Sequence, residues 1–263
     1  MSDEAIYAAA SGAIAQGMRL EVLANNLANI ETTGFKEDES IFSNFMPVDD
    51  SSNVGVLPEF QTVEGCSPLW PYANTNCQVK FDGTSINHSK GPLSQTGNPF
   101  DFAIEGNGFF CVLTGQGEAT FTRNGNFTID STGKLVTQDG LTVLGDNGQE
   151  IVINGKSVSV DDGGVIKADG NDLGALKIVD FDNPYELEKI GSSLFVPSEG
   201  SGPGHVASKF KVKQGFIELS NVDPIKAMTE MIEVQRAFET YQKIIRTMDE
   251  ISSRSINEIG RPV

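Results

Sequence analysis

Two histidines and an acidic cluster are the residues of this sequence whose chemistry could support catalysis or metal binding. His88 and His205 could each serve as a general base, but both lie in polar segments flanked by serine or glycine, without an adjacent nucleophile pattern. The acidic cluster has the oxygen ligands that calcium prefers, yet its spacing misses that of an EF-hand loop and it lacks the closing glutamate. It consists of Asp161, Asp162, Asp169 and Asp172. We therefore interpret the cluster as solvated hairpin turns and expect no enzyme, no catalytic residue, no metal and no cofactor; a calcium-dependent enzyme is the alternative.

The three cysteines divide into a pair in an irregular segment and a single residue in an apolar run. Cys66 and Cys77 could form a disulfide in an oxidising compartment and stabilise their loop by about 2–3 kcal/mol. Two unrelated thiols are the alternative. Cys111 lies in the run GFFCVL and is expected to be a buried small hydrophobic residue.

Composition excludes several classes of partner. The chain has 263 residues, a formal net charge of −17 and a pI near 4.4, which disfavours nucleic acid and anionic membrane surfaces. No segment approaches the ~20 consecutive apolar residues of a membrane span, so we expect no direct membrane insertion. Asp3 and Glu4 open the chain where a secretory signal would be basic, and we expect no cleaved signal peptide.

Apolar residues recur at spacings of four and three at both ends of the chain, the rhythm of a heptad repeat. At the N-terminal end a helix is expected over about 4–30, and its stripe consists of Ile6, Ala10, Ala13, Gly17, Leu20, Ala24 and Leu27. At the C-terminal end Asp223 is expected to cap a helix beginning at Pro224. Its stripe consists of Ala227, Met231, Val234, Phe238, Tyr241, Ile245 and Met248. Small residues on one stripe and bulky ones on the other favour coiled-coil pairing between chains; an intramolecular helix pair is the alternative.

The middle of the chain is β-rich. Short alternating runs such as FDFAI (100–104), ATFTR (119–123), NFTID (126–130) and EIVI (150–153) are separated by Asn-Gly or Asp-Gly pairs typical of hairpin turns. We therefore predict an α+β protein in which long terminal helices form a coiled-coil layer and a central antiparallel β-rich domain lies between them in sequence. The expected parts are an N-terminal helix (1–35), an extended connector with an insertion (36–90), the β-rich domain (91–205), a return connector (206–220) and a C-terminal helix (221–263).

Three colinear segments of the chain carry a family resemblance. They begin with ANNLANIETTGFK (24–36) and end with GFIELSNVDPIKAMTEMIEVQRAFETYQKIIR (215–246), which resemble the N-terminal and C-terminal signatures of the flagellar basal-body rod and hook family of axial proteins. GPLSQTGNPFDFAIEGNGFF (91–110) and FTRNGNFTIDSTGKLVTQDG (121–140) resemble its β domain. The residues of the two apolar stripes are our candidates for assembly contacts. The signatures add to them Asn25, Asn26, Asn29, Gly34, Phe35, Asn221, Ile232, Gln235 and Arg236.

The resemblance implies a structural subunit of the bacterial flagellar basal body. Such a subunit is exported by the flagellar type III apparatus, works in the periplasmic rod, and polymerises through its terminal helices with copies of itself and with other rod proteins. The polymer would surround the export channel and transmit torque from motor to hook. The segment beginning at Asp223 and the region of Met248 look more like the proximal type of rod subunit. A distal rod or hook-type protein is the alternative within the family, and a monomeric β-rich binding protein with a helical stalk is the alternative outside it.

Overall fold

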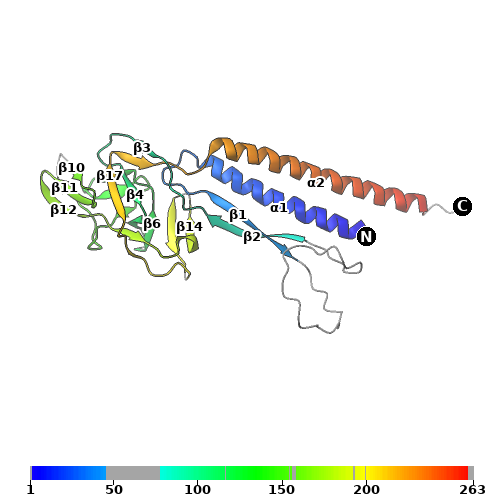
Figure 1. The fold of residues 1–263 in the computed structure, drawn as a ribbon, viewed down its shortest axis with the longest axis horizontal. Coiled ribbons are helices and arrows are strands. Elements are labelled where there is room, and N and C mark those ends of the chain that lie inside the picture. The colour runs from blue at the N-terminus through cyan, green and yellow to red at the C-terminus, as the bar shows by residue number, and fades with distance from the viewer. Residues whose placement is uncertain are drawn as a thin grey trace, which may run out of the picture. The chain divides into compact units, whose positions relative to one another are not determined.

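The chain was analysed in a computed structural model that describes residues 2–45, 78–115, 117–153, 155, 158–191, 193–198 and 200–259 (Figure 1). It forms two compact units. The first unit comprises Met1–Glu21, Ser40–Thr84 and Glu230–Val263, and the second comprises Val22–Glu39 and Ser85–Thr229. Cys66 and Cys77 lie outside the described residues.

Two long helices dominate the ends of the chain. Helix α1 spans Ser2–Ala28 and helix α2 spans Pro224–Ile259. The predicted start of α2 is confirmed, because the Asp223 carboxylate accepts hydrogen bonds from the backbone nitrogens of Ile225 (2.9 Å) and Lys226 (3.3 Å). Across the described residues, no helix is both long and apolar enough to cross a membrane.

Within the first unit the two helices contact each other through small residues of α1 and large residues of α2. A Cβ atom added to Gly12 would lie 2.7 Å from the Tyr241 ring, and one added to Gly17 would lie 3.8 Å from the Phe238 ring. Arg19 and Glu230 form an ion pair of 3.8 Å between the helices. The expected complementarity of small and bulky residues is thus present within one chain, while coiled-coil pairing between chains stays a prediction.

The face that α1 buries differs from the predicted N-terminal stripe by about one residue along the helix. The buried residues of α1 include Ala9, Gly12, Ala13, Leu23 and Asn26. Of the predicted stripe only Ala13 is buried; Ala24 is exposed and the others are partly exposed. A repeat with small residues on several faces does not specify which face a partner covers. On α2 the predicted stripe is buried or partly buried throughout.

The strands of the second unit form mainly antiparallel pairings. The strands along the chain are β1 (Asp38–Phe45), β2 (Gln78–Ile86), β3 (Leu93–Gln95), β4 (Phe102–Gly106), β5 (Phe109–Leu113), β6 (Ala119–Thr122), β7 (Phe127–Ile129), β8 (Leu135–Thr137), β9 (Thr142–Val143), β10 (Val158–Val160), β11 (Val165–Ala168), β12 (Asn171–Ala175), β13 (Ile178–Asp180), β14 (Leu187–Ile190), β15 (Leu194–Pro197), β16 (His205–Val206), β17 (Phe210–Gln214) and β18 (Phe216–Glu218). β1 and β2, which belong to both units, pair only with each other among the described strands. A short 3-10 helix, Pro184–Glu186, precedes β14.

The largest sheet has the order β14-β15-β6-β5-β9-β8-β7, and β13 joins it by pairing with β5 and β16. Strand β5 is buried on both faces, which explains its continuous apolar run. Phe110 and Val112 contribute to one hydrophobic cluster, and Phe109 and Cys111 to another. The expectation that Cys111 is a buried thiol is confirmed, and burial raises its pKa.

The structure corrects two expectations about the β-rich region. The run EIVI (150–153) makes only isolated bridges, Lys134 with Val152 and Leu144 with Glu150, and is not a strand. Residues 206–220, expected to be a return connector, instead carry β17 and β18, which pair with β4 and β3. Their alternation was too short to distinguish strand from connector in the sequence.

Candidate functional site: the junction of the terminal segments

The end of α1 is fixed to the start of β1 by the buried side chain of Asn26. Its Nδ2 donates to the Asp38 carbonyl (2.8 Å), and its Oδ1 accepts from the Asp38 backbone nitrogen (3.0 Å). The carboxamide thus bonds the backbone of Asp38 as a neighbouring strand would, which explains why an asparagine occupies a position that is only 1% exposed. This pair fixes the path of the chain after the helix.

The turn between α1 and β1 packs directly on the β-rich part of the second unit. The Gly34 backbone nitrogen donates to the Glu218 carbonyl (2.8 Å), and the Thr33 hydroxyl donates to Asn124 Oδ1 (2.7 Å). Gly34 has φ of +70°, and a Cβ atom there would lie 2.3 Å from the backbone nitrogen of Asn124. Glycine is therefore required both by the conformation and by the close approach of two backbones.

A cluster of three buried charges lies beneath this turn, and we call Lys36, Glu218 and Arg123 the buried triad. Lys36 Nζ lies 2.6 Å from Glu218 Oε1, and Arg123 Nη1 lies 3.4 Å from Glu218 Oε2. The side chains are 1%, 2% and 7% exposed for Lys36, Glu218 and Arg123 respectively. Burial lowers the pKa of both cations, and the charge of Glu218 opposes that shift in each. The two cations share the Glu218 carboxylate, and the charge of Asp180 also opposes the pKa shift of Arg123.

Backbone groups form further hydrogen bonds with the buried triad. Lys36 Nζ also donates to the Ser89 carbonyl (2.8 Å), and Glu218 Oε1 also accepts from the Gly91 nitrogen (3.0 Å). Arg123 Nη2 donates to the carbonyl of Gly106 (2.9 Å). The triad therefore joins the segment after α1 to β18, to the segment before β3 and to the end of β4.

Phe35 forms the apolar part of the junction. It is fully buried and packs in a cluster with Val222 and Ala227, against which Ile30 also packs. Lys189 Nζ lies 3.7 Å from the centroid of the Phe35 ring, within cation–π range. An aromatic residue here joins the turn after α1 to the first turn of α2.

Lys189 adds polar bonds to the same segment. Its Nζ donates to the Lys36 carbonyl (2.8 Å) and to Asp38 Oδ2 (2.9 Å). Burial lowers the pKa of Lys189, and the hydrogen bond to Asp38 opposes this shift. Strand β14 is thereby attached to the chain between α1 and β1.

Asn221, just before α2, links three segments through its side chain. Its Oδ1 accepts from the Glu37 nitrogen (2.8 Å), and its Nδ2 donates to the Asn87 carbonyl (2.8 Å) and to Ser89 Oγ (2.9 Å). The carboxamide uses both its donor and its acceptor capacity, so the segments leading out of α1 and into α2 are held to the same loop.

The structure brings only some of the predicted site residues into this junction. Asn26, Gly34, Phe35, Asn221 and Ala227 belong to it. Asn29 bonds only locally, donating from Nδ2 to the Asn25 carbonyl (2.9 Å). The remaining candidates lie along α1 and α2, where Ile232, Gln235 and Arg236 are exposed.

Sequence reasoning missed four charged residues of the junction: Lys36, Arg123, Lys189 and Glu218. Lys36, Arg123 and Glu218 lie within the segments that resemble a family, but no local pattern marks a charged side chain as buried. Their partners are distant in the sequence, and only the folded chain brings them together.

The junction contains no nucleophile paired with a base, and the described residues include no group of side chains suited to hold a metal ion. Within the second unit, buried polar bonds hold the last residues of α1 and the segment before α2 to the β-rich part, an arrangement typical of a structural protein.

Comparison with known proteins agrees with this class. The family described as flagella basal body rod protein matches residues 6–36, the flagellar hook protein FlgE/F/G D1 domain matches 103–168, and the flagellar basal body rod FlgEFG protein C-terminal family matches 213–258. The chain is 36% identical to the flagellar basal-body rod protein FlgG of Bacillus subtilis, covering 96% of this chain and 97% of that protein. It is 32% identical to FlgF of Caulobacter vibrioides, covering 98% and 99%.

The chain therefore belongs to the flagellar basal-body rod protein family. It is a structural subunit of the flagellar basal-body rod and not an enzyme, and it assembles with other rod proteins.

Proposed function

We propose that this chain is the proximal rod subunit, FlgF, and that it polymerises through its terminal helices into the shaft that carries torque from motor to hook. The helices of successive copies surround the export channel, and the β-rich unit makes lateral contacts. The chain reaches the periplasmic rod through the flagellar type III export apparatus. Its partners are copies of itself and other rod proteins, and it binds no nucleic acid.

An exposed apolar stripe on α1 supports polymerisation through the helices. Tyr7, Ile14 and Met18 are 67%, 62% and 38% exposed, and their spacings of seven and four residues place them along one line of the helix. This outer stripe lies opposite the face of α1 that carries Gly12, which contacts α2. Three large apolar side chains in a row on a soluble helix favour burial against another helix.

The junction supports the transmission of torque. Force applied to the terminal helices reaches the β-rich part of the second unit through the buried bonds of Asn26, Lys36 and Asn221. Because these bonds are shielded from water and charge-assisted in the case of Lys36, they resist a shearing load better than exposed contacts would.

The role of the outer stripe is tested by Ile14→Asp, with Ile14→Leu as the matched control that keeps an apolar side chain. Ile14 is largely exposed in the single chain, so Ile14→Asp should leave the melting temperature of the purified subunit nearly unchanged. In the rod each copy would bury a charge in place of an isoleucine, whose burial contributes about 1.5–3 kcal/mol. We expect Ile14→Asp to abolish motility and to remove the subunit from isolated basal bodies, and Ile14→Leu to retain both. A motile Ile14→Asp strain would contradict assembly through this stripe.

The proximal assignment rests on the segment from Asp223 to Met228 and on the region from Met248 to Glu250, which look more like the proximal type. Both FlgF and FlgG relatives align over nearly the whole chain, so coverage does not separate the two candidates. The higher identity to FlgG, 36% against 32%, favours the distal rod as the second candidate. Complementation separates them: this chain should restore motility to a strain lacking FlgF and not to one lacking FlgG. Rescue of the FlgG deletion alone would assign it to the distal rod.

A further inference from the structure

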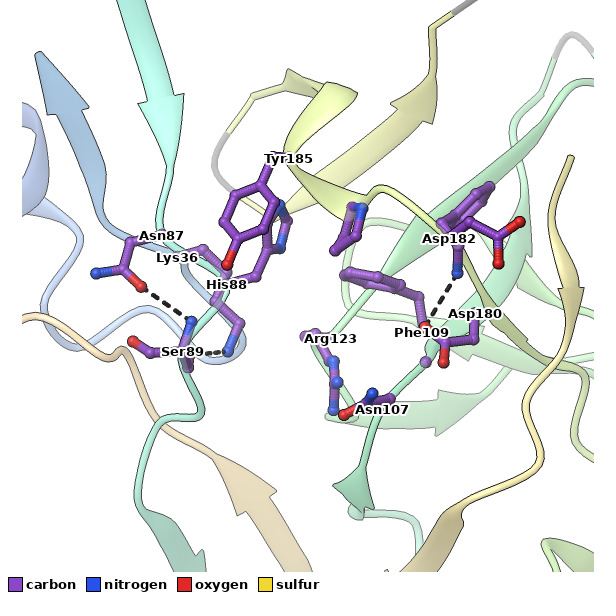
Figure 2. A pocket seen from close by; sticks show the side chains of 13 residues that line it. Lys36, Asn87, His88, Ser89, Asn107, Phe109, Arg123, Asp180, Asp182 and Tyr185 are labelled. Atoms are coloured by element: carbon purple, nitrogen blue, oxygen red, sulfur yellow. Dashed lines mark hydrogen bonds between the residues drawn. The ribbon is translucent and has the colours of Figure 1, made fainter. Parts of the chain in front are cut away.

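The second unit contains a cavity of about 370 Å³ that the proposed rod function does not use. Its inner wall includes His88, Phe109 and Arg123, and its rim includes Tyr185, which is 64% exposed. Figure 2 shows His88 and Tyr185 on one side of this cavity and Asp180 and Asp182 on the other. The volume is at the lower end of the range for small-molecule sites, which fits a ligand of about one ring.

Buried polar atoms at this cavity have no hydrogen-bond partner within the part of the chain that the structure describes. They are both ring nitrogens of His88 and the Nε of Arg123. The Pro184 carbonyl lies near the His88 ring but does not form a hydrogen bond with it by geometry. The Arg123 side chain is 7% exposed, and each of its two terminal nitrogens donates to at least one protein oxygen, whereas its Nε donates to none. Since an unpaired buried polar group is costly, three of them around one cavity indicate an occupant.

The hydrogen-bonding character of these atoms restricts what the occupant can be. Burial, together with the charge of Lys36, lowers the pKa of His88 to about 4, so the ring is neutral near pH 7 and presents one donor and one acceptor. Arg123 Nε presents a donor only. The occupant must therefore both accept and donate hydrogen bonds, as a hydroxyl group does and a carboxylate does not.

The charges around the cavity exclude a strongly charged ligand. Lys36 and Arg123 are both paired with Glu218, and Asp180 and Asp182 add two further carboxylates to the lining. Counting Glu218, which lies outside the lining, three carboxylates face these two cations, which disfavours an anion. A cation is disfavoured at the inner wall by the two buried positive charges. Side chains of Asn87 and Asn107 at the cavity can donate to and accept from a neutral polar group.

We propose that this cavity binds a neutral, polyhydroxylated small molecule, the chemistry of a single sugar ring. One hydroxyl oxygen accepts from Arg123 Nε, and a hydroxyl group exchanges hydrogen bonds with the His88 ring. Tyr185 and the aromatic edge of His88, whose ring centroids are 5.8 Å apart, contact the carbon skeleton. The site lies beside the buried triad, which supplies Arg123 and Lys36 to its wall.

The test is nuclear magnetic resonance of the isotope-labelled full chain with glucose as the neutral probe, glucuronate as its anionic analogue and acetamide as a small amide. We expect glucose to shift the ring-nitrogen signals of His88 and the Nε signal of Arg123, with a dissociation constant on the order of 1 mM. Glucuronate should bind more weakly, because Lys36 and Arg123 are already paired with Glu218 while Asp180 and Asp182 repel an anion. Acetamide should also bind more weakly, because it lacks the hydroxyl groups and the ring.

Matched variants locate the binding. Tyr185→Ala and Asn107→Ala change exposed residues of the lining and should raise the dissociation constant for glucose about five-fold or more. Asn171→Ala, an exposed substitution outside the lining, should leave it unchanged. The absence of a shift at His88 and Arg123, or binding insensitive to both cavity variants, would overturn the proposal. Tighter binding of glucuronate would assign an anion site, and tighter binding of acetamide would assign the cavity to a side-chain amide of a neighbouring protein.

Discussion

Glu218→Gln is the substitution that most directly tests the buried triad. The side chain keeps its shape and part of its hydrogen bonding, since a glutamine oxygen can still accept from Lys36 and from the Gly91 nitrogen. What it loses is the negative charge between Lys36 and Arg123, which are 1% and 7% exposed. Lys36 then stays buried without its compensating carboxylate, and Arg123 keeps only the charge of Asp180.

The magnitude follows from that loss. Removing one partner of a buried ion pair costs about 3–5 kcal/mol, because the remaining charge is desolvated and unpaired. Glutamine retains some hydrogen bonds, so we expect a loss of about 3 kcal/mol in the free energy of unfolding. For a unit of this size each kcal/mol lowers the melting temperature by about 2–4 °C, which predicts a decrease of about 6–12 °C.

The assay is thermal unfolding of the purified chain followed by near-ultraviolet circular dichroism. Glu105→Gln is the matched control, because Glu105 pairs with Lys213 at 2.9 Å but is 52% exposed, so water screens the pair. The second variant, Lys36→Met combined with Glu218→Gln, should be less destabilised than the sum of its single substitutions, since it no longer buries the Lys36 charge. If Glu218→Gln lowers the melting temperature no more than Glu105→Gln does, the triad does not stabilise the junction and the reasoning is refuted.

Three further predictions concern the turn after α1, the buried histidine and the cysteine pair. Gly34→Ala should destabilise the second unit by at least ~2 kcal/mol more than Gly97→Ala. The two glycines have similar φ angles of +70° and +75°, but an added Cβ atom would meet other backbone atoms only at Gly34. Equal losses of stability in urea unfolding would show that the backbone conformation alone matters. The folded-state pKa of His88, about 4, is lower than its ordinary value of 6.5, so the unfolded chain binds more protons between these values and stability falls as pH decreases from 6.5 to 4. His88→Phe should flatten this part of the stability profile, by ~2 kcal/mol once partial exposure is allowed for, and an unchanged profile would contradict the assignment. If Cys66 and Cys77 form a disulfide under oxidising conditions, Cys66→Ser and Cys77→Ser should lower the melting temperature equally, and the double variant should lower it no further. Clearly different effects of the two single substitutions would argue against the disulfide.

The sequence predicted the elements with strong local signals. Asp223 and Pro224 marked the start of α2 correctly because the capping oxygen and the fixed φ angle act on adjacent residues. The Asn-Gly and Asp-Gly pairs located turns, although Gly125 serves a different purpose from the one expected: its φ is not positive, and a Cβ atom there would collide with the Phe102 carbonyl.

What the sequence could not show depends on contacts between distant segments. The face that α1 turns toward α2 is decided by Tyr241 and Phe238, more than two hundred residues away in sequence, and small residues on several sides of α1 left that choice open. Lys36 and Glu218 have nothing in their neighbourhoods that marks them as buried. A charged residue in a loop or at the end of a short strand is normally solvated, and only its partner makes burial possible.

The long separation between the partners of the buried triad has a consequence for the order of folding. Lys36 and Glu218 are 182 residues apart, and Glu37 and Asn221 are 184 apart. Closing loops of this length is entropically costly and slow, and it cannot occur before the last third of the chain is available. While only the first two hundred residues are available to fold, the Lys36 side chain therefore stays in water and the segment after α1 stays undocked. The junction thus forms late in folding, only after the segments near both ends of the chain are available.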